Sequence, residues 1–196
     1  KQTFTVTPVQ MPENISAYAM NYAAEDKTAF TSIKSDSSSN DKTLTYAVSL
    51  YETSFDGSKI EKIEKINFPE EKGYHNGMAT FDTKGKTMFF TRWKVENGKT
   101  ISSIYKSKKT DTGWTKPVSL GQPVNVEGSN TAQPFITADD KYLLFSSDRT
   151  GGIGKFDLWF APLDSNLNPL LVTNMGNIVN TAEDELAPSY HQTSRT

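Results

Sequence analysis

The chain repeats one phrase of sequence at an almost constant interval, and this repeat limits the possible folds more than any other feature. The phrase is a polar turn followed by an apolar run, as in "FDTKGKTMFFTRW" and "ITADDKYLLFSS". Aligned on the basic residue after the turn, the copies stand at Lys27, Lys86, Lys141 and Arg195, at intervals of 59, 55 and 54 residues. Such a period indicates one supersecondary unit that has been copied along the chain.

A second anchor keeps the same period. The segments Leu120–Ile136 and Met175–Tyr190 match one another, and their residues Asn125 and Asn180 lie 55 positions apart. Two independent anchors with nearly one interval are hard to obtain by chance, so we regard the repeat as real.

Each unit has the pattern of several short strands. The apolar run is followed by a polar loop, by a second run such as Ile101–Ser107 or Phe156–Leu163, and by a weaker run that ends in Gly. Prolines at the boundaries exclude long helices. The segment Ser58–Phe68 has Ile at every third position, which suits a helix, but it occupies the place of a fourth strand and is interpreted as an outer strand.

Four strands in each unit of 50 to 60 residues are typical of a β-propeller blade. One blade cannot bury both faces of its sheet, so blades stack on one another. The sequence therefore predicts an all-β fold of four-stranded antiparallel blades at about 15–70, 75–121 and 130–176, with the opening strand of a next blade at 186–196.

Composition agrees with this fold and excludes several functions. Hydrophobic residues make up 35% and aromatic residues 11%, which suits many short strands. The net charge of −2 argues against nucleic acid as a partner. The absence of cysteine excludes disulfides and thiol chemistry. No apolar run approaches the roughly 18 to 20 residues of a membrane helix, so we expect no direct membrane insertion of this segment.

No convergent set of catalytic residues is visible. His75 and His191 are the only histidines, and neither belongs to a closely spaced pair, so both are interpreted as polar loop residues. Asp164–Asn168 resembles the first half of a calcium loop, but Pro169 and Met175 stand where that loop needs Gly and Glu. We therefore expect no catalytic residue, no cofactor and no metal site, and we expect the three Trp residues to serve mostly in packing.

The most distinctive local feature is "SDRTGGIGKFDLW", which should join the second and third strands of its unit. Its glycines permit a left-handed backbone and close approach by another group. Two interpretations stay open: a structural clamp, or direct contact with a ligand or partner. The candidate residues for a partner-binding or structural loop are Arg92, Trp93, Asp148, Arg149, Gly151, Gly152 and Asp157. The polar stretch Lys34–Lys42 stands at a comparable place in the first unit.

These motifs resemble a known family. "DTKGKTMFFTRW", "TADDKYLLFSSDRTGGIGKFDLWFA" and "WTKPVSLGQPVNVEGSNTAQPFI" are similar to the PD40 type of WD40-like β-propeller repeat, over about residues 75–196. The subset concerned comprises periplasmic, outer-membrane-associated lipoproteins with an OmpA-like peptidoglycan-binding domain, some of them in the type IX secretion and gliding machinery. This chain departs from the pattern at Ala29, at "TKGK" and at Asp140, where the family prefers a larger residue, Asp-Gly and Gly. It also lacks the lipid-anchor Cys and the OmpA-like motifs.

The resemblance implies a non-enzymatic, periplasmic interaction scaffold whose partners are other envelope proteins of a secretion or peptidoglycan-associated complex. Peptidoglycan would be reached only through a domain not present here. Because the fourth copy stops after its turn, we also expect the native protein to be longer. The alternatives are the propeller portion of a peptidase or carbohydrate-active enzyme with catalytic residues elsewhere, and a peptidoglycan- or sugar-binding module.

Overall fold

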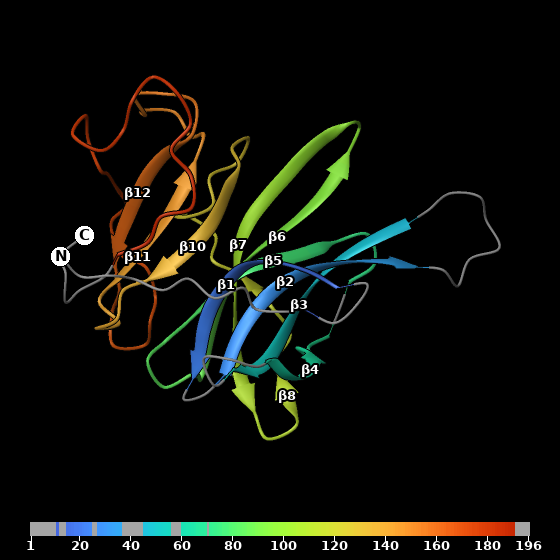
Figure 1. Cartoon of the computed structure of the whole chain (residues 1–196). Helices are drawn as coiled ribbons and strands as arrows, with labels where there is room; N and C mark the ends of the chain where they lie inside the picture. The colour runs from blue at the N-terminus through green and yellow to red at the C-terminus, as the bar shows by residue number, and fades with distance from the viewer. Residues whose placement is uncertain are drawn as a thin grey trace, which may run out of the picture.

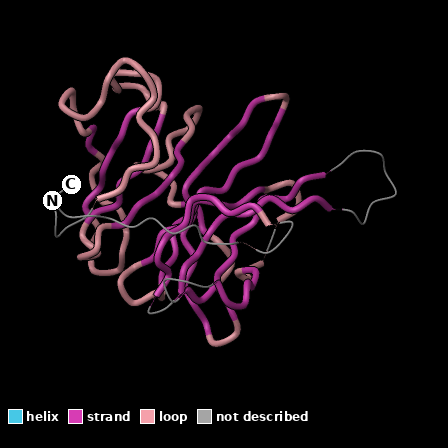
Figure 2. Tube along the Cα trace, in the orientation of Figure 1, coloured by secondary structure: helices cyan, strands magenta, loops and turns pink. Residues whose placement is uncertain are grey.

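The fold is all-β and consists of three antiparallel sheets of four or five strands, consistent with propeller blades. The computed structural model describes residues 11, 15–24, 27–36, 45–55, 60–69 and 71–190. Within these ranges the chain forms thirteen strands. Figure 2 shows strands and loops but no helix in the described part of the chain. The sheets follow one another in chain order (Figure 1).

The sheets are built from consecutive strands. The first contains β1 (Ser16–Ala24), β2 (Lys27–Asp36), β3 (Thr45–Phe55) and β4 (Ile60–Lys65) in that order. The second contains β5 (His75–Phe81), β6 (Thr87–Glu96), β7 (Lys99–Thr110) and β8 (Gly113–Trp114), with β9 (Val118–Ser119) also paired to β7. The third contains β10 (Thr131–Ile136), β11 (Tyr142–Ser147), β12 (Asp157–Pro162) and β13 (Thr173–Asn174).

The alternation of side chains along a strand lets one sheet contribute to two cores. On β6, Phe90 belongs to the core between the first and second sheets, and its neighbour Phe89 belongs to the core between the second and third. Both rings are fully buried. The consecutive apolar residues of the repeat are therefore explained by sheets that are covered on both faces.

The side chains of the repeated residues Asn125 and Asn180 form hydrogen bonds with strand backbone of the kind that a neighbouring strand would make. Asn125 accepts a hydrogen bond from the Ile104 amide at 2.9 Å and donates one to the Ile104 carbonyl at 2.8 Å. Asn180 makes the same pair of bonds with Leu158, at 2.8 and 3.0 Å. In the second and third units one carboxamide thus pairs with the backbone of the third strand, because it offers both a donor and an acceptor.

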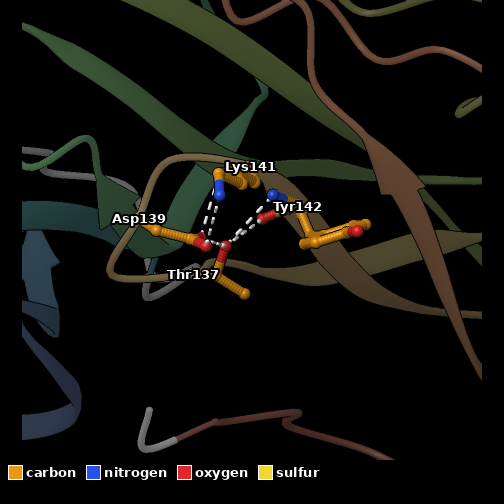
Figure 3. Close-up of polar contacts among 4 residues, drawn as sticks. All are labelled: Thr137, Asp139, Lys141 and Tyr142. Atoms are coloured by element: carbon orange, nitrogen blue, oxygen red, sulfur yellow. Dashed lines mark hydrogen bonds and ion pairs between the residues drawn. The ribbon is translucent and has the colours of Figure 1, made fainter.

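The repeated turn is held by a short polar side chain. In the second unit, Asp82 Oδ1 accepts hydrogen bonds from the amides of Lys86 and Thr87, both at 2.7 Å. In the third unit, the Thr137 hydroxyl donates to Asp139 at 2.7 Å and accepts from the Tyr142 amide at 3.0 Å (Figure 3). Side-chain bonds of this kind fix tight turns without a Gly at each position.

Asp140 stands in the third unit where the second unit has a turn glycine. It takes a left-handed φ of 58°, at the position where Gly85 has 60° in the second unit. Its carboxylate accepts bonds from the Thr83 amide at 2.9 Å and from the Thr83 hydroxyl at 2.5 Å. Asp140 therefore joins the turns of two neighbouring sheets.

The outer strands match the predicted places but are shorter than predicted. Within Ser58–Phe68 the described part forms the strand β4, as predicted, and not a helix. The runs that end in Gly contribute only the two-residue strands β9 and β13, and β8 was not predicted. Residues 186–190 carry no strand, and 191–196, with His191 and Arg195, lie outside the described residues, as do 37–42 of the polar loop.

Candidate ligand-binding pocket

The first strands of the three sheets meet, and each carries a β-bulge at the same place. Strand β5 contacts β1 on one side and β10 on the other. The strand register shifts between Tyr18 and Asn21, between Gly77 and Thr80, and between Ala132 and Phe135. A bulge inserts an extra residue and redirects the side chains beside it. Three redirected segments therefore converge where the first strands meet.

Each bulge contains a residue in the left-handed region. These residues are Ala19, Met78 and Gln133, with φ of 51°, 56° and 57°, and Ala187 follows with 53°. Their intervals are 59, 55 and 54 residues, the same as the intervals of the repeat. A left-handed conformation costs a non-glycine residue about 1 kcal/mol or more. Contacts with the rest of the molecule must therefore hold these residues in place.

Hydroxyl groups of the preceding sheet supply that contact. The Met78 amide donates to Thr31 Oγ1, and the Gln133 amide donates to Thr91 Oγ1, both at 2.8 Å. We call this bond between a bulge amide and a threonine the hydroxyl clasp. Both threonines are buried, so an unpaired amide at the bulge would cost about 1–3 kcal/mol.

The third position uses a modified form of the clasp. Ser146 stands where the other units have Thr31 and Thr91, and its hydroxyl donates to Gln133 Oε1 at 3.1 Å. The same oxygen accepts from the Ala187 amide at 2.7 Å. The Gln133 carboxamide thus lies between the serine and the fourth left-handed residue.

The bulges surround a pocket of about 490 Å³, which we call the bulge pocket. Its walls include Tyr18, Met20, Met78, Gln133 and Phe135. Every residue that lines it is uncharged, and most of the lining is apolar. Burial raises the pKa of the Tyr18 phenol above its ordinary value, so this group is neutral at pH 7. The volume lies within the range of pockets that bind small ligands or single side chains.

A second hollow, of about 370 Å³, lies against the third sheet. It is lined by Tyr142, Leu144, Phe160, Met175 and Tyr190, with the turn of Figure 3 at its edge. The rings of Tyr142 and Phe160 meet edge to face, with centroids 6.0 Å apart.

The glycine-rich loop between β11 and β12 is arranged around Asp157. This carboxylate is 1% exposed and accepts bonds from the amides of Ile153 at 2.6 Å and Gly154 at 2.9 Å, and from Asn174 at 2.7 Å. Burial raises the pKa of Asp157, but the three hydrogen bonds outweigh it and leave the pKa below its ordinary value. A Cβ on Gly152 would lie 2.7 Å from the Asp157 carboxylate. The loop is therefore closely packed.

Arg149 joins this loop to the segment that enters the third sheet. Its guanidinium donates to the carbonyls of Pro123, at 2.8 Å, and Val124. It also stacks over Phe145 and Trp159, at 5.0 and 5.1 Å from their centroids. Burial lowers the pKa of Arg149 to about 10, partly opposed by the nearby Asp148, so the side chain is charged at neutral pH.

Asp148 and Gly151 belong to the same loop but differ in their surroundings. Asp148 accepts bonds from the amide of Asn130 at 2.5 Å and from its side chain at 3.0 Å. Gly151 has φ of 88° and open space where a Cβ would be. Five of the seven predicted residues therefore lie together around one loop, and four of them make structural contacts.

The other two predicted residues lie in the second sheet. Arg92 and Trp93 belong to β6 and not to a loop. Arg92 is buried, donates to Asn76 at 2.8 Å and lies 4.9 Å from the centre of the Tyr105 ring. Trp93 packs on His75, with ring centroids 5.5 Å apart. Whether any of the seven residues contacts a partner stays a prediction.

Sequence reasoning missed the bulge pocket. Its left-handed residues each stand eight positions before the aligned Lys or Arg, so the period could have located them. Their types, Ala, Met, Gln and Ala, give no indication of a left-handed backbone.

The weaker candidates are structural in the described residues. His75 is the first residue of strand β5 and not the loop residue that we expected, because it pairs with Trp93 of β6. Its Nδ1 accepts a bond from the Val48 amide at 3.3 Å, which joins the first two sheets. Asp164 accepts from the amides of Asn166 and Asn168, both at 2.8 Å, as a turn residue does. No group of three or more His, Cys, Asp or Glu in the described ranges is placed to hold a metal ion. The same ranges contain no helix long and apolar enough for a membrane span.

Comparison with known proteins gives a likeness of fold. No protein-family model matches the chain, and no curated protein matches its sequence. Among solved structures, the crystal structure of alpha-L-arabinofuranosidase from Lactobacillus brevis is similar, with a TM-score of 0.48 and 10% identity. The match covers 93% of this chain and 61% of that one, so this chain spans less than two thirds of that structure. At this level the likeness carries no argument about activity, and the resemblance to the PD40 repeat stays a prediction.

Proposed function

We propose that the chain is a non-catalytic binding module, a section of a propeller that holds a protein partner of a cell-envelope or secretion assembly in the periplasm. The observation that carries this proposal is the bulge pocket, an open, uncharged cavity built by the same device in successive units. The repeat motifs, with their resemblance to envelope propellers, support the location.

The chemistry of the pocket suits binding. Glycoside hydrolysis requires a pair of carboxyl groups, and proton transfer in general requires a group that titrates near neutral pH. The lining offers amides, a phenol, thioethers and an aromatic ring instead. These groups hold a ligand by packing and by neutral hydrogen bonds.

A second candidate is a neutral saccharide as the ligand. Tyr18, Asn21 and Gln133 line the pocket together, and rings and carboxamides are groups that stack on sugars and bind their hydroxyls. This alternative corresponds to a sugar-binding module, and the experiment in the next subsection separates it from a protein partner.

Site-specific photo-crosslinking in the native cell tests the proposal. A photoreactive residue replaces Met20, which is 50% exposed in the pocket wall, and a matched control replaces the exposed Lys116 outside it. We expect one defined envelope protein to be crosslinked from position 20 and not from position 116. Equal crosslinking from both positions, or turnover of glycoside or peptide substrates by the purified protein, would contradict the proposal.

A further inference from the structure

We propose that the bulge pocket binds an apolar side chain presented by an uncharged, extended segment of the partner. This inference rests on the proposed function, because it names the chemistry by which the protein partner would be held. It goes further in choosing a hydrophobic anchor over a charged group or a sugar.

The apolar part of the pocket is adaptable. Met20 and Met78 stand on neighbouring first strands, and Phe135 with Pro134 closes the wall from the third sheet. Unbranched thioether side chains adjust to ligands of different shape and are frequent at surfaces that bind hydrophobic peptides. A cavity of about 490 Å³ has room for one large side chain together with the flanking backbone.

The uncharged lining argues against a charged group as the anchor of the partner. Among the described residues that form the walls there is no Lys, Arg, His, Asp or Glu. A charged ligand group would lose hydration there without gaining an opposite charge. An uncharged segment avoids this cost.

The polar groups match a peptide better than a sugar. Gln133 Oε1 is already occupied by the Ser146 hydroxyl and the Ala187 amide. The side-chain nitrogen of Gln133, Nε2, is a donor that suits a peptide carbonyl. The Asn21 carboxamide offers an NH₂ donor group and an oxygen acceptor, which match the C=O and N–H of a peptide group. A saccharide has a hydroxyl on nearly every ring carbon and would leave several of them unpaired against Met and Phe.

The five methionines provide a reporter for the test. Met20 and Met78 line the bulge pocket, Met175 lines the second hollow, and Met88 is buried between the first and second sheets. The whole chain is labelled with ¹³C at the methionine methyl groups, and NMR follows each signal. The probes are capped pentapeptides with Leu, Phe, Asp or Lys between pairs of Gly, and the neutral disaccharides maltose and cellobiose.

We expect the Leu and Phe peptides to shift the methyl signals of Met20 and Met78 in a saturable manner. The signals of Met88 and Met175 should not shift. The Asp and Lys peptides should bind at least about tenfold more weakly, because their charge must be desolvated. Shifts produced by a disaccharide in preference to the peptides, or confined to Met175, would overturn the inference.

Two substitutions on β1 sharpen the result. Met20→Glu places a carboxylate in the pocket wall and should weaken the Leu peptide about tenfold or more. Tyr22→Glu adds the same charge at a residue that is 78% exposed and outside the lining, and should leave binding unchanged. An unshifted Met88 signal shows that each variant is folded. An equal loss of affinity for the Leu peptide in both variants would contradict the inference.

The failure of this inference differs from the failure of the proposed function. If position 20 crosslinks a defined envelope protein but no apolar peptide shifts Met20 or Met78, the partner binds by other chemistry and only the inference is wrong. If neither crosslinking nor peptide binding is observed, both are wrong.

Discussion

The two interfaces between the three sheets use one backbone device with different support from side chains. Both contain the hydroxyl clasp, made by Thr31 at the first interface and by Thr91 at the second. Both also contain a buried apolar core. The difference lies in the polar contacts around them.

The first interface relies mainly on packing in the part that the structure describes. Its core is rich in large rings, with Phe68, Phe81, Phe90 and Trp114. The centroids of Phe68 and Phe90 lie 5.4 Å apart. Ala29, the small residue of the degenerate first copy, is buried in the same core as these rings.

Apart from the clasp, the described part of the first interface has the side-chain-to-backbone bond from the Val48 amide to His75, and the second interface has several bonds of this kind. Asn130 accepts a bond from the Ser102 amide at 2.9 Å, Thr80 accepts one from the Ile136 amide at 3.2 Å, and Asp140 joins the two turns through Thr83. The comparison indicates that the clasp positions the bulges, while rings or polar bonds supply the remaining stability of each interface.

Replacement of Arg149 should cause the largest loss in the free energy of unfolding. Arg149 donates to the Val124 carbonyl, and Val124 belongs to the core of the second interface. Arg149→Met keeps the apolar stem but leaves the carbonyls of Pro123 and Val124 without their donor, so we expect a loss of about 3 kcal/mol in the free energy of unfolding. Urea denaturation measures it. Lys155→Ala in the same loop is the control, because the Lys155–Glu183 pair is exposed and is worth at most about 1 kcal/mol. A loss no larger than that of the control would show that Arg149 does not hold the interface.

Asp157 should come next, because its hydrogen bonds shape the loop that carries Arg149. We expect Asp157→Asn to cost about 2 kcal/mol at pH 7, since bonds to an ionised acceptor are lost. The pKa of Asp157 is lower in the folded state than in the unfolded state. Its contribution is therefore complete above the unfolded pKa, near 3.8, and is lost as the pH falls through the lower folded value.

Urea denaturation of both proteins between pH 3 and pH 7 checks this. The difference in the free energy of unfolding between the parent protein and Asp157→Asn should be constant above about pH 5 and should become smaller below pH 4. A difference that does not change with pH would mean that ionisation of Asp157 plays no part.

Removal of the clasp hydroxyl should lower the free energy of unfolding by a similar amount at both interfaces. Thr31→Val and Thr91→Val keep the shape of a buried side chain but leave the half-buried amide of Met78 or Gln133 without its acceptor, which costs about 1–2 kcal/mol each. Unfolding free energies of the two variants make the comparison. A large effect at one interface and none at the other would mean that the clasp is not a shared device.

Asp140 should have the smallest effect, because its replacement has two opposed consequences. Asp140→Gly relieves the left-handed backbone but removes both bonds to Thr83, so the net change should stay within about 1 kcal/mol. Asp140→Ala removes the same bonds without relieving the backbone and should be the less stable variant. Thermal unfolding of the pair checks the order, and the reverse order would exclude strain at this residue.

The all-β fold of several short strands could be predicted because the period and the apolar runs can be read directly from the sequence. The roles of Asn125 and Asn180 as equivalent anchors and the strand nature of Ile60–Lys65 were also accessible in this way. The pocket was not accessible, because Met78 and Gln133 take a left-handed backbone through bonds to threonines 47 and 42 residues away. Similarly, the loop of Arg149 could be predicted from its glycines, but its acceptors, the carbonyls of Pro123 and Val124, carry no residue-specific signal.

The bulge pocket is built around one repeated left-handed position, which a hydroxyl or a carboxamide of the protein itself holds at Met78, Gln133 and Ala187. Amide hydrogen exchange, followed by NMR at Met78, Gln133 and Ala187, tests it most directly. Bulge residues lack a partner in the regular strand ladder, yet the account predicts slow exchange at all three amides, comparable with that of the paired strand β6. Fast exchange at these amides, like that of an exposed loop, would contradict the clasp and, with it, the pocket that depends on it.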